Sequence, residues 1–326
     1  MVPRYTNFIL LLTVVLHVQL MAQLTVNNGF NAQQLGNNLA GSNITIINPS
    51  ISGNATQYGQ FNYVGNDLGL NSGVILSTGS IFDAVGPNTS GNTGTDFGLP
   101  GNADLTALGG FQTFDAVVFE FEFEVQGDEL EFNFVFLSEE YNEYVNQGFN
   151  DIFAFYISGP GINGQENIAV VPGTTTPVTI NTINNNSFFQ FYNDNTNGSV
   201  NVEFDGFTTL MKASRSNLTP CGVYKLSLRI ADGGDDRLDS GVLLQENSLV
   251  SNSVTVSSST ISVDTTALEG CFPATYTFNL GATAQVDYNI PIRLGGTALN
   301  GVDYTLIDSI ITIPQGQTSS TVQCTG

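Results

Sequence analysis

The sequence predicts an all-β protein: an antiparallel, jelly-roll-like β-sandwich followed by an incomplete immunoglobulin-like sandwich. The first observation is alternation, because Phe and Glu alternate through residues 119–125 and apolar residues recur at every second position through residues 130–136. This period of two is typical of strands with one buried face. The second is composition, since 35 Gly and 23 Phe in 326 residues suit many strands joined by turns. The third is that no segment longer than residues 31–39 has a helical pattern.

The short connection at residues 126–128 predicts that the two alternating segments form a β-hairpin. Any register that stacks Phe on Phe also sets like charges opposite one another, with Glu120, Glu122 and Glu124 across from Glu129, Glu131 and Asn133. Solvation, bases on a neighbouring strand or a bound cation could offset this repulsion. Residues 224–230 form another alternating strand, with Lys225 and Arg229 on its polar face. These bases either face the Glu side chains or point into water.

The other elements of the first domain follow in order. Residues 24–110 are rich in Asn, Gly, Ser and Thr, with short apolar strands at 44–47 and 74–76 and a short helix capped by Asn31. Residues 87–110, with six glycines, are expected to be an exposed loop. Further strands are expected at residues 152–158, 167–171, 178–183, 188–192, 200–204, 222–231 and 241–250.

A polar, Ser-rich stretch then sets a domain boundary, so that residues 23–250 form the first domain and residues 251–326 the second. Strands are expected in the second domain at residues 275–280, 288–294 and 310–313. An immunoglobulin-like sandwich needs about 100 residues, and about 75 are present. We therefore expect this domain to be truncated, with any anchoring or sorting signal beyond Gly326.

The charge balance restricts the partners. The chain has 29 acidic and 7 basic residues, a net charge of −22, which disfavours nucleic acid and anionic membranes and favours cations. Arg4 precedes an apolar run at residues 8–20, the layout of a secretory signal peptide over residues 1–22. Its removal leaves no membrane-spanning segment and takes away His17, the one histidine. A chain without His cannot build a Ser/His/Asp or Cys/His catalytic site, nor a His-ligated zinc site.

Three cysteines remain after export to an oxidising compartment. One pairing joins Cys271 to Cys324 and leaves Cys221 as a buried free thiol. The other pairings stay open, and no CxxC spacing indicates a metal site.

Two acidic loops could hold a metal ion. Residues 231–240 contain four Asp and two adjacent Gly between two expected strands, and a flexible loop with several oxygen ligands suits Ca²⁺. The second acidic loop follows residue 138. If both loops meet at one end of the sandwich, they need a cation. The predicted calcium ligands are Glu139, Glu140, Asp151, Asp232, Asp235 and Asp239.

Two alternatives remain for these carboxylates. Residues 231–240 could form an acidic turn in which Arg237 pairs locally. Alternatively, Glu139 and Asp235 could act as a carboxylate pair in glycoside cleavage. The chain has no Trp to form a platform for sugars, and this disfavours the glycosidase hypothesis.

The first domain resembles the choice-of-anchor L domain of secreted bacterial surface proteins. The matching segments are Gly73-Val74-Ile75-Leu76-Ser77-Thr78-Gly79, Ser138-Glu139-Glu140-Tyr141, residues 149–161, Asn167-Ile168-Ala169, Pro172-Gly173-Thr174, Asp205-Gly206-Phe207-Thr208, Pro220-Cys221, Ile230-Ala231-Asp232 and Asp239-Ser240. The resemblance implies an extracellular β-domain carried by proteins with varied C-terminal anchors.

The second domain resembles Calx-β-like modules. The matching segments are Gly296-Thr297-Ala298, Gly301-Val302-Asp303-Tyr304-Thr305 and residues 311–319. That resemblance implies calcium-binding acidic residues at one end. The domain pair resembles surface proteins of Bacteroidetes-type bacteria, which often leave the cell by the type IX secretion route.

These observations lead to one hypothesis with two alternatives. We expect an exported, non-catalytic cell-surface or adhesin-type protein, stabilised by calcium, which binds an extracellular glycan or a surface protein through its loops. The first alternative is a non-catalytic accessory region of a larger secreted hydrolase. The second is a glycosidase that uses the carboxylate pair. The oligomeric state stays open.

Overall fold

The computed structural model describes residues 23–41, 44–252, 254–260, 273–280, 284 and 287–326. Strands account for 43% of the described residues and helices for 8%, so the predicted all-β class is confirmed. The predicted signal peptide and the Cys271 half of the predicted disulfide lie outside the described residues. Cys221 is exposed, so its prediction as a buried thiol is wrong.

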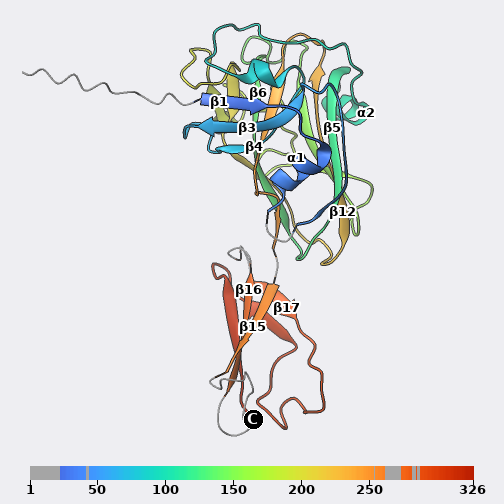
Figure 1. Ribbon diagram of the computed structural model, residues 1–326, viewed down its shortest axis with the longest axis vertical. Coiled ribbons are helices and arrows are strands. Elements are labelled where there is room, and N and C mark those ends of the chain that lie inside the picture. The colour runs from blue at the N-terminus through green and yellow to red at the C-terminus, as the bar shows by residue number, and fades with distance from the viewer. Residues whose placement is uncertain (1–22, 42–43, 253, 261–272, 281–283, 285–286) are drawn as a thin grey trace, which may run out of the picture.

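Residues 23–251 form two antiparallel sheets that pack face to face (Figure 1). The first sheet follows the order β1-β3-β4-β13-β6-β10-β9, and β11 and β14 also pair with β6. Its strands are β1 (Gln23–Asn27), β3 (Tyr58–Val64), β4 (Ser72–Ser77), β6 (Leu130–Ser138), β9 (Tyr192–Asp194), β10 (Gly206–Thr208), β11 (Met211–Arg215), β13 (Ser240–Gln245) and β14 (Val250–Ser251). The second sheet follows the order β2-β5-β12-β7-β8, with strands β2 (Ile46–Ser52), β5 (Thr113–Glu124), β7 (Ile152–Ser158), β8 (Glu166–Asn167) and β12 (Val223–Gly233).

The predicted hairpin of the two alternating segments is wrong. Both segments are strands, but β5 pairs with β2 and β12 in one sheet, and β6 pairs with β10, β11, β13 and β14 in the other. Their Phe side chains face each other across the sandwich core instead of lying side by side. Separating the strands removes the Glu-to-Glu register, which gives a physical reason for the arrangement.

The partner of β5 supplies the bases that the Glu side chains need. Glu122 lies opposite Lys225, and Glu120 lies opposite Ser227. Lys225 pairs with Glu120 at 2.8 Å, and the largely buried Arg229 contacts Asp104 and lies 3.5 Å from Glu120. Of the two alternatives for these bases, the structure shows the one in which they face the acidic side chains.

The central core lies between the two sheets and is rich in Phe. A second apolar cluster covers the other face of β4, β6 and β13, where Ile75, Val135 and Leu137 meet residues from β1, β3 and the 3₁₀-helix η1 (Ile81–Ala84). The first sheet therefore curls and buries both faces near the end of β6. This end carries the acidic residues described below.

Two α-helices flank the sheets. α1 (Ala32–Leu39) begins after Asn31, whose side chain accepts from the backbone N–H of Gln34, as predicted. α2 (Ala103–Gly109) is capped by Asn102 and buries Leu105. The sequence pattern did not predict α2, because the helix is short and lies within a glycine-rich stretch.

Three of the predicted strands are wrong. Residues 178–183 form a turn, in which the hydroxyl of Thr182 donates to the carbonyl of Pro177 and the amide of Asn184 donates to that of Ile180. Residues 188–192 contain the 3₁₀-helix η2 (Phe189–Phe191), and residues 200–204 are mostly bends. Side-chain-to-backbone hydrogen bonds of this kind compete with strand pairing, so apolar spacing alone misled the prediction.

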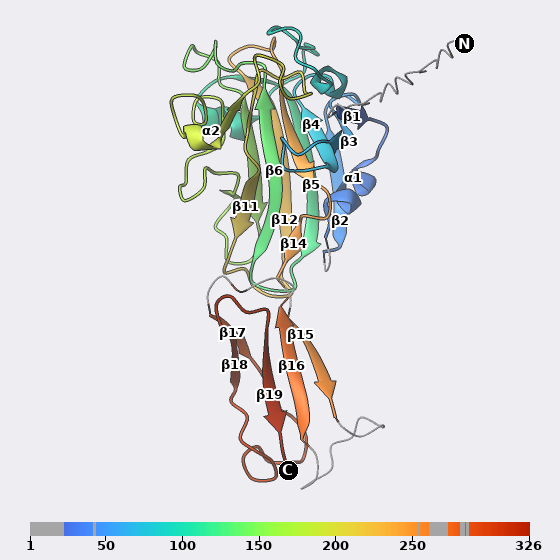
Figure 2. The same cartoon turned by 90° about the vertical axis from the view of Figure 1, so that its left-hand side faces the viewer.

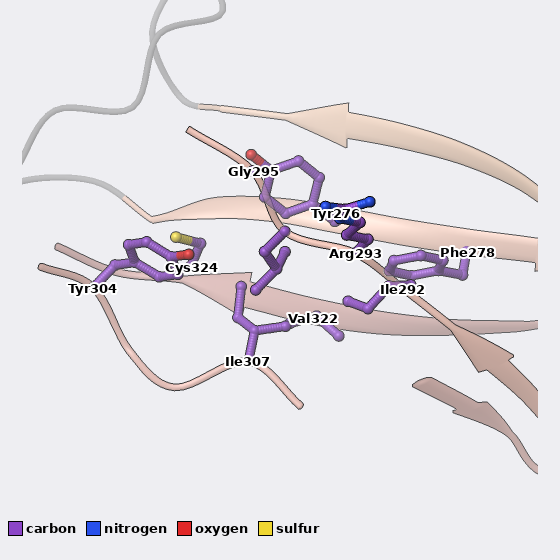
Figure 3. A pocket seen from close by; sticks show the side chains of 10 residues that line it. Tyr276, Phe278, Ile292, Arg293, Gly295, Tyr304, Ile307, Val322 and Cys324 are labelled. Atoms are coloured by element: carbon purple, nitrogen blue, oxygen red, sulfur yellow. The ribbon is translucent and has the colours of Figure 1, made fainter. Parts of the chain in front are cut away.

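The remaining strands form two smaller antiparallel sheets, one of β15 (Val254–Ser259), β16 (Ala274–Leu280) and β19 (Ser319–Cys324), the other of β17 (Tyr288–Pro291) and β18 (Ile310–Ile313). They pack around a small apolar core that includes Phe278 and Ile313. Beside this core, Tyr276, Tyr304 and Cys324 line a cavity of about 460 Å³ (Figure 3). Figure 2 shows these strands beyond β14, at one end of the larger sandwich.

Asn252, between β14 and β15, forms hydrogen bonds with the turn that follows β5. Its amide nitrogen donates to the carboxylate of Asp128 at 2.9 Å, and its side-chain oxygen accepts from the backbone of Glu129 at 2.8 Å. The hydroxyl of Ser251 accepts from the backbone of Gly127 at 3.1 Å. The turn between β5 and β6 is therefore held directly against the connecting chain.

Candidate metal centre

The two acidic loops meet at the end of the sandwich that lies away from strands β15 to β19 (Figure 1 and Figure 2). β6 and β13 pair with Ser138 opposite Ser240, so the residue after β6 lies next to the residue before β13. Glu139 accordingly donates its backbone N–H to the carbonyl oxygen of Asp239 at 3.0 Å. The end of β12 and the start of β7 are likewise neighbours.

Asp151, at the start of β7, ties the two loops together. One carboxylate oxygen accepts from the backbone N–H of Gly233 at 2.9 Å, and the other accepts from the hydroxyl of Ser240 at 2.7 Å. The backbone N–H of Asn150 donates to the carbonyl oxygen of Gly233 at 2.7 Å. These contacts fix the acidic loops relative to each other.

The structure brings the six predicted ligands to this one end, but it does not place them alike. Five of them are only 1–3% exposed: Glu139, Glu140, Asp151, Asp232 and Asp239. Asp235 is half-buried and lines a small cavity of about 110 Å³ together with Glu140 and Arg237. Burying this many carboxylates has a high free-energy cost unless each is neutralised or paired.

Several of these buried carboxylates lack hydrogen-bond partners. Both oxygens of Glu139, both oxygens of Asp232 and one oxygen of Glu140 have none. The backbone N–H of Thr93 favours the ionised form of Glu139, as the Thr78 side chain does for Asp232, but neither reaches hydrogen-bonding geometry. Such atoms are rare in folded proteins and call for a partner.

The electrostatic environment holds protons on these groups. Burial, and then the charge of neighbouring carboxylates, raises the pKa of Glu139 to about 9 and that of Glu140 to about 10. The same causes raise the pKa of Asp239 to about 8 and that of Asp232 well above its ordinary value. Burial also raises the pKa of Asp151, to about 7, although its hydrogen bonds oppose the rise. At neutral pH the ionised cluster therefore needs positive charge.

The glycine-rich segment is mostly exposed over residues 87–100, as expected, but its backbone also contacts the acidic cluster. The backbone N–H of Thr95 donates to both carboxylate oxygens of Asp239, at 3.1 and 3.2 Å. The backbone N–H groups of Phe97 and Leu99 donate to the buried Asp115. Backbone N–H groups that find no strand partner in this loop thus find carboxylates instead.

Two further acidic residues of this end, Glu203 and Asp205, are buried and were not among the predicted ligands. Glu203 accepts from the backbone N–H of Thr89 at 3.2 Å and from the hydroxyl of Thr93 at 2.8 Å. Asp205 accepts from the amide of Asn88 at 2.6 Å. Asp205 stands in a segment that matched the family resemblance, and its position directly before a strand was the available signal.

The donor set limits which ion could bind. Carboxylate, hydroxyl and carbonyl oxygens suit hard cations such as Ca²⁺, whereas zinc prefers His and Cys. In the part of the chain that the structure describes, three or more His, Cys, Asp or Glu side chains do not converge on a single ion position. Binding here would therefore require small side-chain movements or neutral oxygen ligands in addition to carboxylates.

Comparison with known proteins agrees with this architecture. A family model, the choice-of-anchor L domain, matches residues 24–250, which is more than half of the chain. The protein belongs to the choice-of-anchor L family. No curated protein and no solved structure matches the chain. The match ends at Val250, so the likeness of the following residues to Calx-β modules stays a prediction.

Membership of the choice-of-anchor L family places the chain among surface-associated proteins, in a non-enzymatic class of domain. Within the residues described, none of the helices has the length and apolar character needed to cross a bilayer.

The geometry of the choice-of-anchor L domain bears on the two alternatives for the carboxylates. Arg237 makes no ion pair among the described residues, so the locally paired acidic turn is wrong. The proposed glycosidase pair does not share a cleft, because Glu139 is buried while Asp235 lines the small cavity beside Glu140.

Proposed function

We propose that the protein is an exported, non-catalytic cell-surface or adhesin-type protein whose choice-of-anchor L domain is stabilised by Ca²⁺. The ion would be held by carboxylates among Glu139, Glu140, Asp151, Asp232, Asp235 and Asp239. Residues 1–22 would direct export as a signal peptide, with the type IX route as the proposed path to the surface.

One observation carries this proposal: the carboxylates of Glu139 and Asp232 are buried without hydrogen-bond partners beside other buried acids. A proton can neutralise each of these carboxylates, but holding a proton at neutral pH costs free energy because an ordinary carboxyl group is ionised there. A divalent cation neutralises two carboxylates at once and supplies the missing contacts to their oxygens. Calcium tolerates irregular sets of six to eight oxygen ligands, whereas Mg²⁺ demands near-octahedral geometry.

The same end of the domain is proposed to contact an extracellular glycan or a surface protein. Residues 88–96 and 194–199 are polar, mostly exposed loops beside the acidic cluster. A calcium ion beneath such loops would hold them in one conformation and reduce the entropy lost on binding. This supports loop-mediated recognition that depends on calcium.

Thermal unfolding of the exported protein tests the calcium proposal. Free Ca²⁺ at one hundred times its dissociation constant should stabilise the folded state by about 2.7 kcal/mol over the chelated protein. For a domain of this size that corresponds to roughly 5–10 °C in Tm. The same concentration of Mg²⁺ serves as the control and should give a smaller shift. Identical melting curves in Ca²⁺ and in chelator would refute the calcium part of the proposal.

Binding to extracellular material is tested separately. Labelled protein should bind a glycan array or whole cells in Ca²⁺ and lose that binding in chelator. Equal binding in Ca²⁺ and in chelator would refute the proposal that ligand recognition depends on calcium at the acidic cluster.

A further inference from the structure

The carboxylates at this end form two groups rather than one. Glu203 and Asp205 accept hydrogen bonds from residues 88–93, and burial, together with their charges and that of Asp239, raises the pKa of Glu139. Asp151 instead accepts from Gly233 and Ser240, and burial, together with its charge and that of Asp235, raises the pKa of Glu140. Asp232 lies with Asp151 and Glu140 as well as near Asp239. We name Glu140, Asp151 and Asp232 the inner group, and Glu139, Glu203 and Asp205 the loop group. Asp239 lies between them.

Strand register explains the loop group. β6 pairs with β10 through Ser138 opposite Gly206, and with β13 through Ser138 opposite Ser240. Continuing both registers by one residue sets Asp205, Glu139 and Asp239 side by side on three adjacent chains. Like charges directly opposite one another destabilise a sheet, and here both outer carboxylates flank the central one.

Glu139 supplies an independent sign of a ligand. It is 1% exposed, and neither of its carboxylate oxygens has a hydrogen-bond partner. By contrast, Asp239 accepts from the backbone of Thr95, and Asp205 accepts from Asn88. The central carboxylate of the row is therefore the one left without a donor, between the chains that carry Asp205 and Asp239.

Residues 88–95 lie over the loop group. Thr89 and Thr93 donate to Glu203, and Asn88 donates to Asp205. The same segment also packs closely on residues 231–240, since a Cβ on Gly94 would lie 2.1 Å from the carbonyl oxygen of Arg237. The hydroxyl oxygens of Thr89 and Thr93, which donate to Glu203, keep lone pairs that can serve as neutral ligands beside the carboxylates.

We propose that the loop group binds a divalent cation of its own, with the oxygen chemistry of Ca²⁺, separate from an ion held by the inner group. This ion fixes residues 88–95 to the end of the sandwich. The inference rests on the proposed function, because it divides the proposed calcium centre into two positions. It also brings in Glu203 and Asp205, which lie outside the predicted ligand set.

Calcium stoichiometry, measured by equilibrium dialysis on the full exported chain, tests the division. The unchanged protein should bind two ions. The double variant Glu203→Gln/Asp205→Asn should bind one, and Asp232→Asn should also bind one. Glu246→Gln, at an exposed carboxylate in the turn after β13, is the matched control and should bind two.

Hydrogen exchange identifies which ion is lost. In Ca²⁺ the backbone amides of residues 88–95 should be protected in the unchanged protein and in Asp232→Asn, but not in Glu203→Gln/Asp205→Asn. These isosteric substitutions remove repulsion, so without calcium the double variant should melt no lower than the unchanged protein. The single variant Asp205→Asn should weaken the same ion and provides a second, milder test.

The outcomes separate this inference from the proposed function. One bound ion in the unchanged protein, unaffected by Glu203→Gln/Asp205→Asn, overturns the loop site and leaves the calcium proposal standing. Binding of no ion overturns both. Two ions that both persist in the double variant also overturn the loop site.

Discussion

Replacing Glu139 by Gln is expected to stabilise the calcium-free protein at neutral pH. Glu139 is buried without a hydrogen-bond partner, and burial together with Asp205, Glu203 and Asp239 raises its pKa from 4.5 to about 9. The folded state therefore keeps a proton that the unfolded chain releases above pH 4.5. Holding that proton at pH 7 costs about 3 kcal/mol, because each pH unit is worth 1.36 kcal/mol. A Gln side chain avoids this cost and can donate to the neighbouring carboxylates.

The sign of the pH dependence follows from the same shift. The folded state binds more protons than the unfolded state between pH 4.5 and about 9, so the stability of the unchanged protein falls as pH rises through that range. The advantage of Glu139→Gln should accordingly vanish near pH 4, reach about 3 kcal/mol at pH 7 and level off above pH 9. In Ca²⁺ the order should reverse, because the variant has lost a ligand.

Urea unfolding in chelator at several pH values, repeated in Ca²⁺, measures these differences. If Glu139→Gln is less stable than the unchanged protein at pH 7 in chelator, the carboxylate has a stabilising partner and the reasoning is wrong. A difference between the two proteins that does not change between pH 4 and pH 8 would refute the raised pKa.

Two further predictions use substitutions with matched controls. Gly79→Ala would place a Cβ 1.8 Å from a carboxylate oxygen of Asp239, so it should abolish most of the calcium-dependent Tm shift. The control is Gly295→Ala, whose Cβ would have no atom within 4 Å and which should leave that shift unchanged. Arg229→Met should destabilise the protein by about 2 kcal/mol, since it leaves the carboxylates of Asp104 and Glu120 without this partner. Lys225→Met, at a side chain that is 47% exposed, should cost less than about 1 kcal/mol. Urea unfolding measures both free energies.

Alternation allowed the strands themselves to be predicted but not their partners. The patterns of β5, β6 and β12 were recognised because a buried face imposes a period of two, whereas β7 is a continuous apolar run that is buried on both faces. The same parity fits a hairpin and a pair of facing strands, so pattern alone could not separate the two. In the structure β5 pairs with β12, where Glu122 lies opposite Lys225, and β6 lies in the other sheet. Charge complementarity between β5 and β12 was the signal that could have predicted this pairing.

The acidic end was predicted only in part, because a local pattern shows the acidic loops but not the distant residues that contact them. Clustered carboxylates in two loops could be seen in the sequence, and the loops do meet. The contacts that cover them join Thr89 to Glu203 and Thr95 to Asp239, which are 114 and 144 residues apart. No local pattern encodes such pairs. They follow from strand order, which places β10 and β13 on either side of β6.

Strand order also explains why hydrogen bonds alone do not satisfy this end. The outer members of the carboxylate row, Asp205 and Asp239, can be reached by the loop of residues 88–95. Glu139 lies between them, directly after the central strand β6, and its backbone N–H is already bonded to the carbonyl oxygen of Asp239. A neutral donor that reached its carboxylate would reduce the desolvation cost without changing the net negative charge of the row. Only a proton or a cation removes that charge, and the two differ in their pH dependence, because protons are lost as pH rises while the ionised carboxylates bind cations more tightly.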